Sequence, residues 1–179
     1  MMTRLAVGLT VAAALFAQTG NRKVTANNKL SPPADTSVAL GGKKVTIEYN
    51  APSARGRKVE GGLITYDSIW RLGADAATTL TTEGDIMIGD LRVPQGVHTL
   101  YLAATSDTDW KLAVNEQKGQ WGTQYDQSMD LGRVPMKVTK LGSPVETLKI
   151  ELQPAGGSAA TLQISWGSSR ATVPIKLAS

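Results

Sequence analysis

The chain has 179 residues, no cysteine, one histidine and a formal net charge of +4 at pH 7. Without cysteine there are no disulfides, so the hydrophobic core alone must hold the fold. A charge this small attracts nucleic acid or anionic lipid only weakly, and we expect neither as a partner. A single histidine with no thiolate also leads us to expect no metal site and no cofactor.

The first 17 residues are typical of a secretory signal peptide. Arg4 supplies the positive start, and residues 5–17 form an apolar run that ends at the small residue Ala17. That run is shorter than the roughly 20 residues that a membrane-spanning helix needs. We therefore expect cleavage after Ala17 and export to the periplasm or the cell exterior. An uncleaved membrane anchor is the alternative.

Residues 18–35 show no hydrophobic period and contain a Pro-Pro pair, which predicts a flexible tether. A single domain is then expected over residues 36–179. Its first two strands are predicted at 36–40 and 43–49, where apolar and polar residues alternate on either side of Gly41-Gly42.

The alternation continues along the chain. Further strands are predicted at 86–88, 91–93, 97–105, 110–115, 145–153, 160–166 and 171–177. Short strands separated by regular turn signals indicate an all-β protein, here one antiparallel β-sandwich or jelly-roll-like domain. The one helical candidate is Tyr66–Leu72, with Thr65 as its N-cap and Gly73 as its C-cap.

The sequence offers few groups for catalysis. His98 has no identifiable catalytic partner, and no nucleophile elbow, phosphate loop or dinucleotide motif is present. We therefore expect no catalytic residue. A pair of loop carboxylates keeps glycoside hydrolysis open as an alternative, because such pairs form in space; the candidates are Asp67, Asp75, Asp126 and Asp130.

One candidate ligand site surrounds the expected helix. Its members combine guanidinium forks, which bind carboxylates, phosphates or hydroxyls, with an aromatic stacking face: Arg57, Trp70, Arg71 and Asp75. The alternative is structural. Trp70 would then plug one end of the sandwich, and Arg71 would pair with Asp75 or with a backbone carbonyl.

The second candidate is the loop 119–130, which contains Trp121 and Tyr125. Long loops of this composition bind polar ligands or pack on themselves. We therefore hypothesise a non-catalytic module that binds a glycan or a small anionic ligand at a loop rim formed by both segments. A glycoside-type hydrolase and an envelope protein that binds a protein partner are the alternatives.

Several ordered segments of the chain resemble a known family. EYNAPSARGRKVEGGLITYDSIWRLGADAATT, VPQGVHTLYL and KGQWGTQYDQSMDLGRVPMKV resemble the bacterial secreted family catalogued as domain of unknown function 2911. The resemblance extends from Ser31 to Leu177. It implies export and a β-rich domain, and it implies no particular activity.

The chain departs from the family pattern at three places. Ala51 replaces an arginine, Asp75-Ala76 replaces Asn-Glu, and His98 replaces a tyrosine, whereas Trp70 and Arg71 match. A glutamate that acts as acid or base in relatives could not act at position 76 of this chain.

Overall fold

The structure is a computed structural model and describes residues 30–179. The predicted signal peptide and most of the predicted tether lie outside these residues. The strands are β1 (Pro33–Leu40), β2 (Lys43–Asn50), β3 (Ser68–Trp70), β4 (Thr79–Thr82), β5 (Ile86–Ile88), β6 (Leu91–Val93), β7 (Gly96–Ala104), β8 (Trp110–Asn115), β9 (Asp130–Pro154) and β10 (Ala159–Leu177). Strand β1 thus begins three residues before the expected start of the domain.

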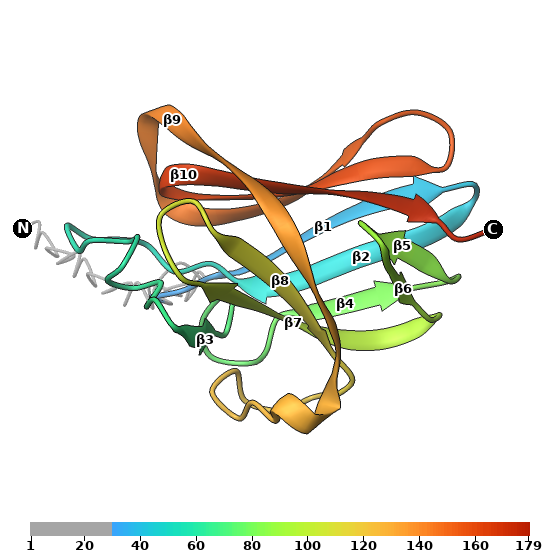
Figure 1. Cartoon of the computed structure of the whole chain (residues 1–179), viewed down its shortest axis with the longest axis horizontal. Helices are drawn as coiled ribbons and strands as arrows, with labels where there is room; N and C mark the ends of the chain where they lie inside the picture. The colour runs from blue at the N-terminus through green and yellow to red at the C-terminus, as the bar shows by residue number, and fades with distance from the viewer. Residues whose placement is uncertain (1–29) are drawn as a thin grey trace, which may run out of the picture.

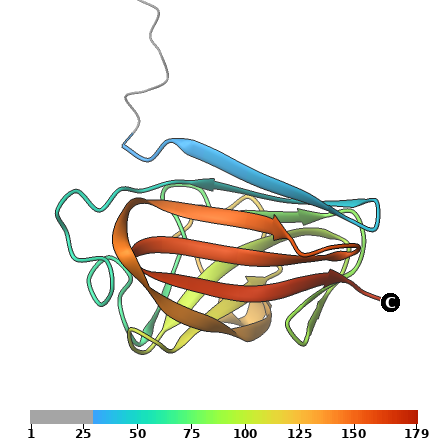
Figure 2. The same cartoon turned by 90° about the horizontal axis from the view of Figure 1, so that it is seen from above.

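The strands form an antiparallel sandwich of two layers (Figures 1 and 2). One layer has the order β1-β2-β4-β7-β8 and is continued by the first part of β9. The other contains the rest of β9 with β10, β5 and β6. The expectation of an all-β, antiparallel sandwich is confirmed. No helix within residues 30–179 is long and apolar enough to cross a membrane.

The longest strand, β9, joins the layers. β9 pairs with β8 through residues 130–136 and with β10 through residues that follow, so one strand serves both layers. The sequence predicts only 145–153 of β9 and divides β10 into two strands. β10 is instead continuous, with a bulge at Gly167, whose φ is +57°. A Cβ there would lie 2.8 Å from Cβ of Val59, so glycine is required.

The core lies between the layers and follows the predicted alternation. In β2, Val45 and Ile47 are fully buried, while Lys44 and Glu48 face solvent. In β10, Leu162 and Ile164 are fully buried from the opposite layer. Period-two burial of this kind is what places one face of each strand in the core.

The prediction of a helix at Tyr66–Leu72 is wrong. Ser68–Trp70 form strand β3, which pairs antiparallel with the end of β7. Asp67 and Leu72, on either side of it, have φ values of +56° and +49°, which no helix tolerates. Seven residues are too few to hold a helix unaided, and the edge of β7 beyond β4 offers them hydrogen bonds instead. The helical element that the described residues do contain is the 3₁₀ turn η2 (Gln127–Met129).

Candidate functional site

A hollow of ≈ 260 Å³ lies where the segment after β2 meets β3, and we call it the arginine hollow. Three guanidinium groups and two indole rings contribute to its walls. The lining residues are Leu30, Ser31, Pro52, Ser53, Arg55, Arg57, Leu63, Trp70, Arg71, Gly73, Ala74 and Trp166. None of these residues is acidic, so the hollow is a place of positive charge.

Backbone carbonyls hold the three arginines in place. Arg57 donates from Nε to the carbonyl of Ala54 at 2.9 Å and from Nη2 to that of Ser53 at 2.9 Å. Arg71 donates from Nε to the carbonyl of Gly73 at 3.1 Å. Arg55 donates from Nη2 to the carbonyl of Leu30 at 2.7 Å. Each guanidinium has five donors, so each keeps N–H groups that these bonds do not use.

Within residues 30–179, Arg55, Arg57 and Arg71 form no ion pair, and the carboxylate of Glu146 accepts from the backbone N–H of Arg55 at 2.7 Å and not from its guanidinium. The ion pairs of the described chain join Arg92 to Asp85, Arg133 to Asp130, Lys140 to Asp107 and Lys149 to Glu151. Arg55, Arg57 and Arg71 are in none of them. The arrangement therefore presents fixed, unneutralised guanidinium groups to whatever enters the hollow.

The aromatic wall of the hollow is a stacked pair of indoles. Trp70 and Trp166 have ring centroids 5.3 Å apart and planes inclined by 19°. Trp166 is 1% exposed, whereas Trp70 is half-buried. The indole N–H of Trp166 donates to the carbonyl of Glu146 at 3.0 Å. The structural alternative is met in part. Arg71 pairs with a backbone carbonyl, as that alternative expects, and Trp70 packs on the core while one of its sides still lines the hollow.

The loop between β8 and β9 docks onto the segment after β3. The N–H of Gly122 donates to the carbonyl of Asp75 at 2.9 Å, and Ala76 forms an isolated bridge with Trp121. A Cβ at Gly122 would lie 3.0 Å from Cδ of Arg71 and from the carbonyl oxygen of Asp75, so a larger residue would need its neighbours to shift. The two candidate segments are therefore brought together.

A second hollow of ≈ 390 Å³, the tyrosine hollow, forms where these segments meet. It is lined by Leu63, Ile69, Trp70, Arg71, Tyr101, Gly122, Thr123 and Tyr125. The rings of Tyr101 and Tyr125 meet edge to face, with centroids 4.8 Å apart. Aromatic side chains and hydroxyl groups thus dominate this hollow.

Tyr125 is fixed by a polar network. Its hydroxyl donates to Oδ2 of Asp130 at 2.5 Å and accepts from Nη2 of Arg133 at 2.8 Å. Desolvation and the hydrogen bond to Asp130 raise the pKa of Tyr125 above its usual 10.0. Asp130 also accepts from Nδ2 of Asn115 at 3.0 Å. The phenol therefore stays neutral and its ring keeps one orientation.

The structure brings four of the six predicted site residues together. Arg57, Trp70 and Arg71 line the arginine hollow, and Trp70, Arg71 and Tyr125 line the tyrosine hollow. Asp75 contributes a backbone carbonyl to the loop contact and lines neither hollow. Trp121 is 52% exposed and lies beside the hollows, opposite Ala76.

Two aromatic lining residues were not among the predicted site residues. Trp166 lies in β10 and Tyr101 in β7, and both are buried residues inside predicted strands. Their contacts with Trp70 and Tyr125 join segments distant in sequence. The local pattern therefore carried no signal of their place in the site.

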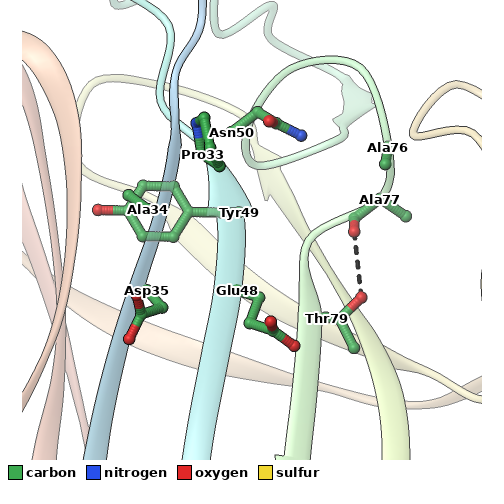
Figure 3. A pocket seen from close by; sticks show the side chains of 9 residues that line it. All are labelled: Pro33, Ala34, Asp35, Glu48, Tyr49, Asn50, Ala76, Ala77 and Thr79. Carbon is green, nitrogen blue, oxygen red and sulfur yellow. Dashed lines mark hydrogen bonds between the residues drawn. The ribbon is translucent and has the colours of Figure 1, made fainter. Parts of the chain in front are cut away.

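An acidic hollow of ≈ 430 Å³ lies beside Ala76 and Ala77, in the segment between β3 and β4. Asp35 of β1 and Glu48 of β2 are register partners, and both line the hollow beside Thr79 (Figure 3). No basic residue lines it. Both acids are exposed on the outer sheet face, where water satisfies them.

The loop carboxylates that could serve a hydrolase are in part committed to structure. Asp126 accepts from the N–H and from Oγ of Ser128, at 2.9 and 2.6 Å, and caps η2. Asp130 is held by Tyr125 and Arg133. Within residues 30–179, no three potential metal-ligating side chains gather into a site.

Comparison with known proteins gives a family and no activity. The family described as "Protein of unknown function (DUF2911)" matches residues 31–175. Neither the curated proteins nor the solved structures contain a significant match to the chain. The family match covers most of the chain and nearly all of the sandwich described above. The chain therefore belongs to the DUF2911 family.

Proposed function

We propose that this protein is a non-catalytic binding module whose ligand is a glycan or a small polar or anionic molecule. The observation that carries the proposal is the arginine hollow, which three guanidinium groups line without any acidic residue. Charges of one sign in a recess raise the local concentration of the opposite charge. An anionic group is therefore the feature that this site selects.

The way in which the arginines are held supports the proposal. Arg71 uses only its Nε for the carbonyl of Gly73, which leaves the terminal Nη groups for a ligand. A guanidinium edge can bind a carboxylate or a phosphate with two parallel hydrogen bonds. Because this hydrogen bond already orients the side chain of Arg71, binding costs less side-chain entropy than for a free arginine.

The aromatic wall supports a ligand that also has a flat face. Trp70 is half-buried against Trp166, so its ring is fixed before any ligand arrives. Binding sites of small molecules combine such aromatic surfaces with a few oriented polar groups. A sugar ring or a small carboxylic acid fits this combination.

The alternative functions have less support among the described residues. A hydrolase needs a pair of free carboxylates on one cleft. Of the four loop candidates, Asp126 and Asp130 serve as the cap of η2 and as a network acceptor, and the remaining two, Asp67 and Asp75, line none of the described hollows together. A docking surface for a protein partner needs a contiguous apolar patch. The exposed large hydrophobic residues of the described chain are Leu30, Trp121 and Met129.

We also propose that the module acts outside the cytoplasm, because residues 1–17 have the composition of a signal peptide. Expression of the full chain with its native N-terminus, followed by cell fractionation and intact-mass measurement, tests this. A fractionated protein that begins at Gln18 is expected. An intact N-terminus in the cytoplasmic fraction would contradict export.

Tryptophan fluorescence tests the binding proposal. Sodium galacturonate, citrate and chitobiose serve as probes of an anionic sugar, a small anion and a neutral glycan. Trp70 lines the hollow, so a saturable change in emission is expected with at least one probe. Trp121→Phe serves as a control, because it removes the most exposed indole without touching the hollow. A flat response to all three probes would refute the proposal.

A further inference from the structure

The arginine hollow is the first of three adjoining hollows that follow β3. The tyrosine hollow shares Leu63, Trp70 and Arg71 with it. A third hollow of ≈ 460 Å³ shares Ile69 and Tyr125 with the tyrosine hollow. We call it the Arg133 hollow; it is lined by Asp67, Ser68, Ile69, Ala103, Ala104, Thr105, Tyr125, Gln127 and Arg133. Such a row suits an elongated ligand better than a single small ion.

Positive charge is concentrated at one end of the row. Three unneutralised arginines line the arginine hollow, and Arg71 is the one charged residue of the tyrosine hollow. At the far end, Asp130 pairs with Arg133 at 3.1 Å, and Asp67 adds a negative charge to the lining. The row therefore distinguishes an anionic end of a ligand from a neutral end.

The middle of the row offers rings and hydroxyl groups. The ring of Tyr125 is held by its bonds to Asp130 and Arg133, and the exposed Thr123 adds a hydroxyl beside it. Rings with polar edges and hydroxyl groups suit a ligand with flat apolar faces and many hydroxyls, which is the surface of a sugar ring.

We infer that the ligand is an acidic oligosaccharide that lies along β3 with a carboxylate in the arginine hollow. This inference rests on the proposed function and names the ligand class of the same site. An acidic peptide would have to add as a strand to β3, but β3 has only three residues and so offers few backbone groups for pairing. The stacked ring of Trp70 and the phenol of Tyr125 favour sugar rings instead.

Calorimetric titration of the full domain with matched sugars tests the inference. The probes are trisaccharides of galacturonate, mannuronate and guluronate, each with its monosaccharide and its fully methyl-esterified form. The ester keeps every hydroxyl and removes the charge. At least one acidic trisaccharide is expected to bind about tenfold or more tighter than its monosaccharide and its ester, because it gains both ring contacts and charged hydrogen bonds.

A blocked middle hollow separates an elongated ligand from a small one. Thr123→Tyr places a bulky side chain at an exposed position in the lining of the tyrosine hollow, so the fold should tolerate it. This variant should lose the advantage of the trisaccharide and keep the affinity for the monosaccharide. Thr108→Tyr is the matched control, since Thr108 is exposed in the β7–β8 turn and lines none of the three hollows.

The outcomes distinguish the two levels of the proposal. If a monosaccharide acid binds but no trisaccharide binds tighter, the inference is wrong and the anion site stands. Equal affinity for acid and ester, or tighter binding of tri-glutamate than of every acidic trisaccharide, would overturn the ligand class. If no acid and no sugar binds, the proposed function fails together with the inference.

Discussion

Two hollows of opposite charge flank one short segment of this protein. Gly73 and Ala74 line the arginine hollow, whereas Ala76 and Ala77 line the acidic hollow. The arginine hollow has three basic residues and no acid, and the acidic hollow has two acids and no base. The contrast shows that positive and negative side chains gather on opposite sides of the short segment from Gly73 to Ala77.

The two hollows differ in how their charged groups are held. Asp35 and Glu48 lie on regular strands and point into solvent, so water competes for them. Arg57 and Arg71 lie on irregular backbone and are fixed by carbonyls of the same segments. Only the arginine hollow has a preorganised charge beside a packed aromatic wall, which is the combination that binding requires.

The aromatic wall gives the largest expected effect. Trp166→Ala removes a fully buried indole from beneath Trp70 and should lower the free energy of unfolding by about 3–5 kcal/mol. Trp121→Ala removes an exposed indole and should change it by no more than about 0.5 kcal/mol. Urea denaturation of both variants measures this. Equally small changes in the free energy of unfolding for both variants would show that Trp166 does not support Trp70 from the core.

The guanidinium of Arg71 gives the next effect. Arg71→Gln should weaken binding of an anionic probe by about tenfold to a hundredfold, because hydrogen bonds between charged groups contribute about 1.5–3 kcal/mol. Arg92→Gln removes the same charge from β6, where Arg92 pairs with Asp85 outside the hollow, and should leave the affinity nearly unchanged. Similar losses in both variants would show that net charge, and not the hollow, governs binding.

The contact between the two candidate segments can be broken at Gly122. Gly122→Ala brings a Cβ within 3.0 Å of Cδ of Arg71 and of the carbonyl oxygen of Asp75, so it should cost about 1–3 kcal/mol of stability. Gly142→Ala is the control, because nothing lies within 4 Å of its added Cβ. Thermal denaturation compares them. Equal melting temperatures would mean that the loop does not dock on Arg71.

A pH-dependent effect is expected at the turn before β3. The hydroxyl of Tyr66 donates to Oδ1 of Asp107. Desolvation and this bond raise the pKa of Tyr66 from 10.0 to about 12. The unfolded chain therefore loses this proton first, and the free energy of unfolding should decline as pH rises above 10.0 toward about 12.

The variant Tyr66→Phe isolates this contribution. Urea denaturation from about pH 9 to about pH 11 should show a shallower decline with pH for the variant than for the unchanged protein. The bond from Tyr66 also lowers the pKa of Asp107 below 3.8. The free energy of unfolding should therefore decline as pH falls below about 3.8, and this decline should be smaller in the variant. Identical pH profiles for the two proteins would show that the hydrogen bond between Tyr66 and Asp107 does not stabilise the folded state.

Most of the regular strands could be predicted from the sequence, whereas β3, β4 and the first part of β9 could not. The β1–β2 hairpin follows from alternation around Gly41 and Gly42, both of which have positive φ. The segment Tyr66–Leu72 has a helix-like pattern, but the open edge of β7 provides the pairing that decides its form. Such tertiary effects override local preference, and one sequence does not reveal them.

The candidate site was predictable to a similar extent. One part of the site lies within a short stretch of sequence that contains Arg57, Trp70 and Arg71. The residue types there were enough to predict a candidate ligand site. Tyr125 joined them because its loop docks through Gly122. Trp166 completes the wall from β10, and its contact depends on how the layers pack, which strand periodicity does not determine.

The central claim is that anions bind in the arginine hollow and not in the acidic one, and a residue-resolved titration tests it most directly. In ¹H–¹⁵N spectra recorded with increasing sodium galacturonate, the arginine Nε–H signals of Arg57 and Arg71 and the indole signal of Trp70 should shift together. The backbone signals of Asp35 and Glu48 should stay in place. Shifts centred on the acidic hollow, or no saturable shift at the three groups of the arginine hollow, would contradict the account.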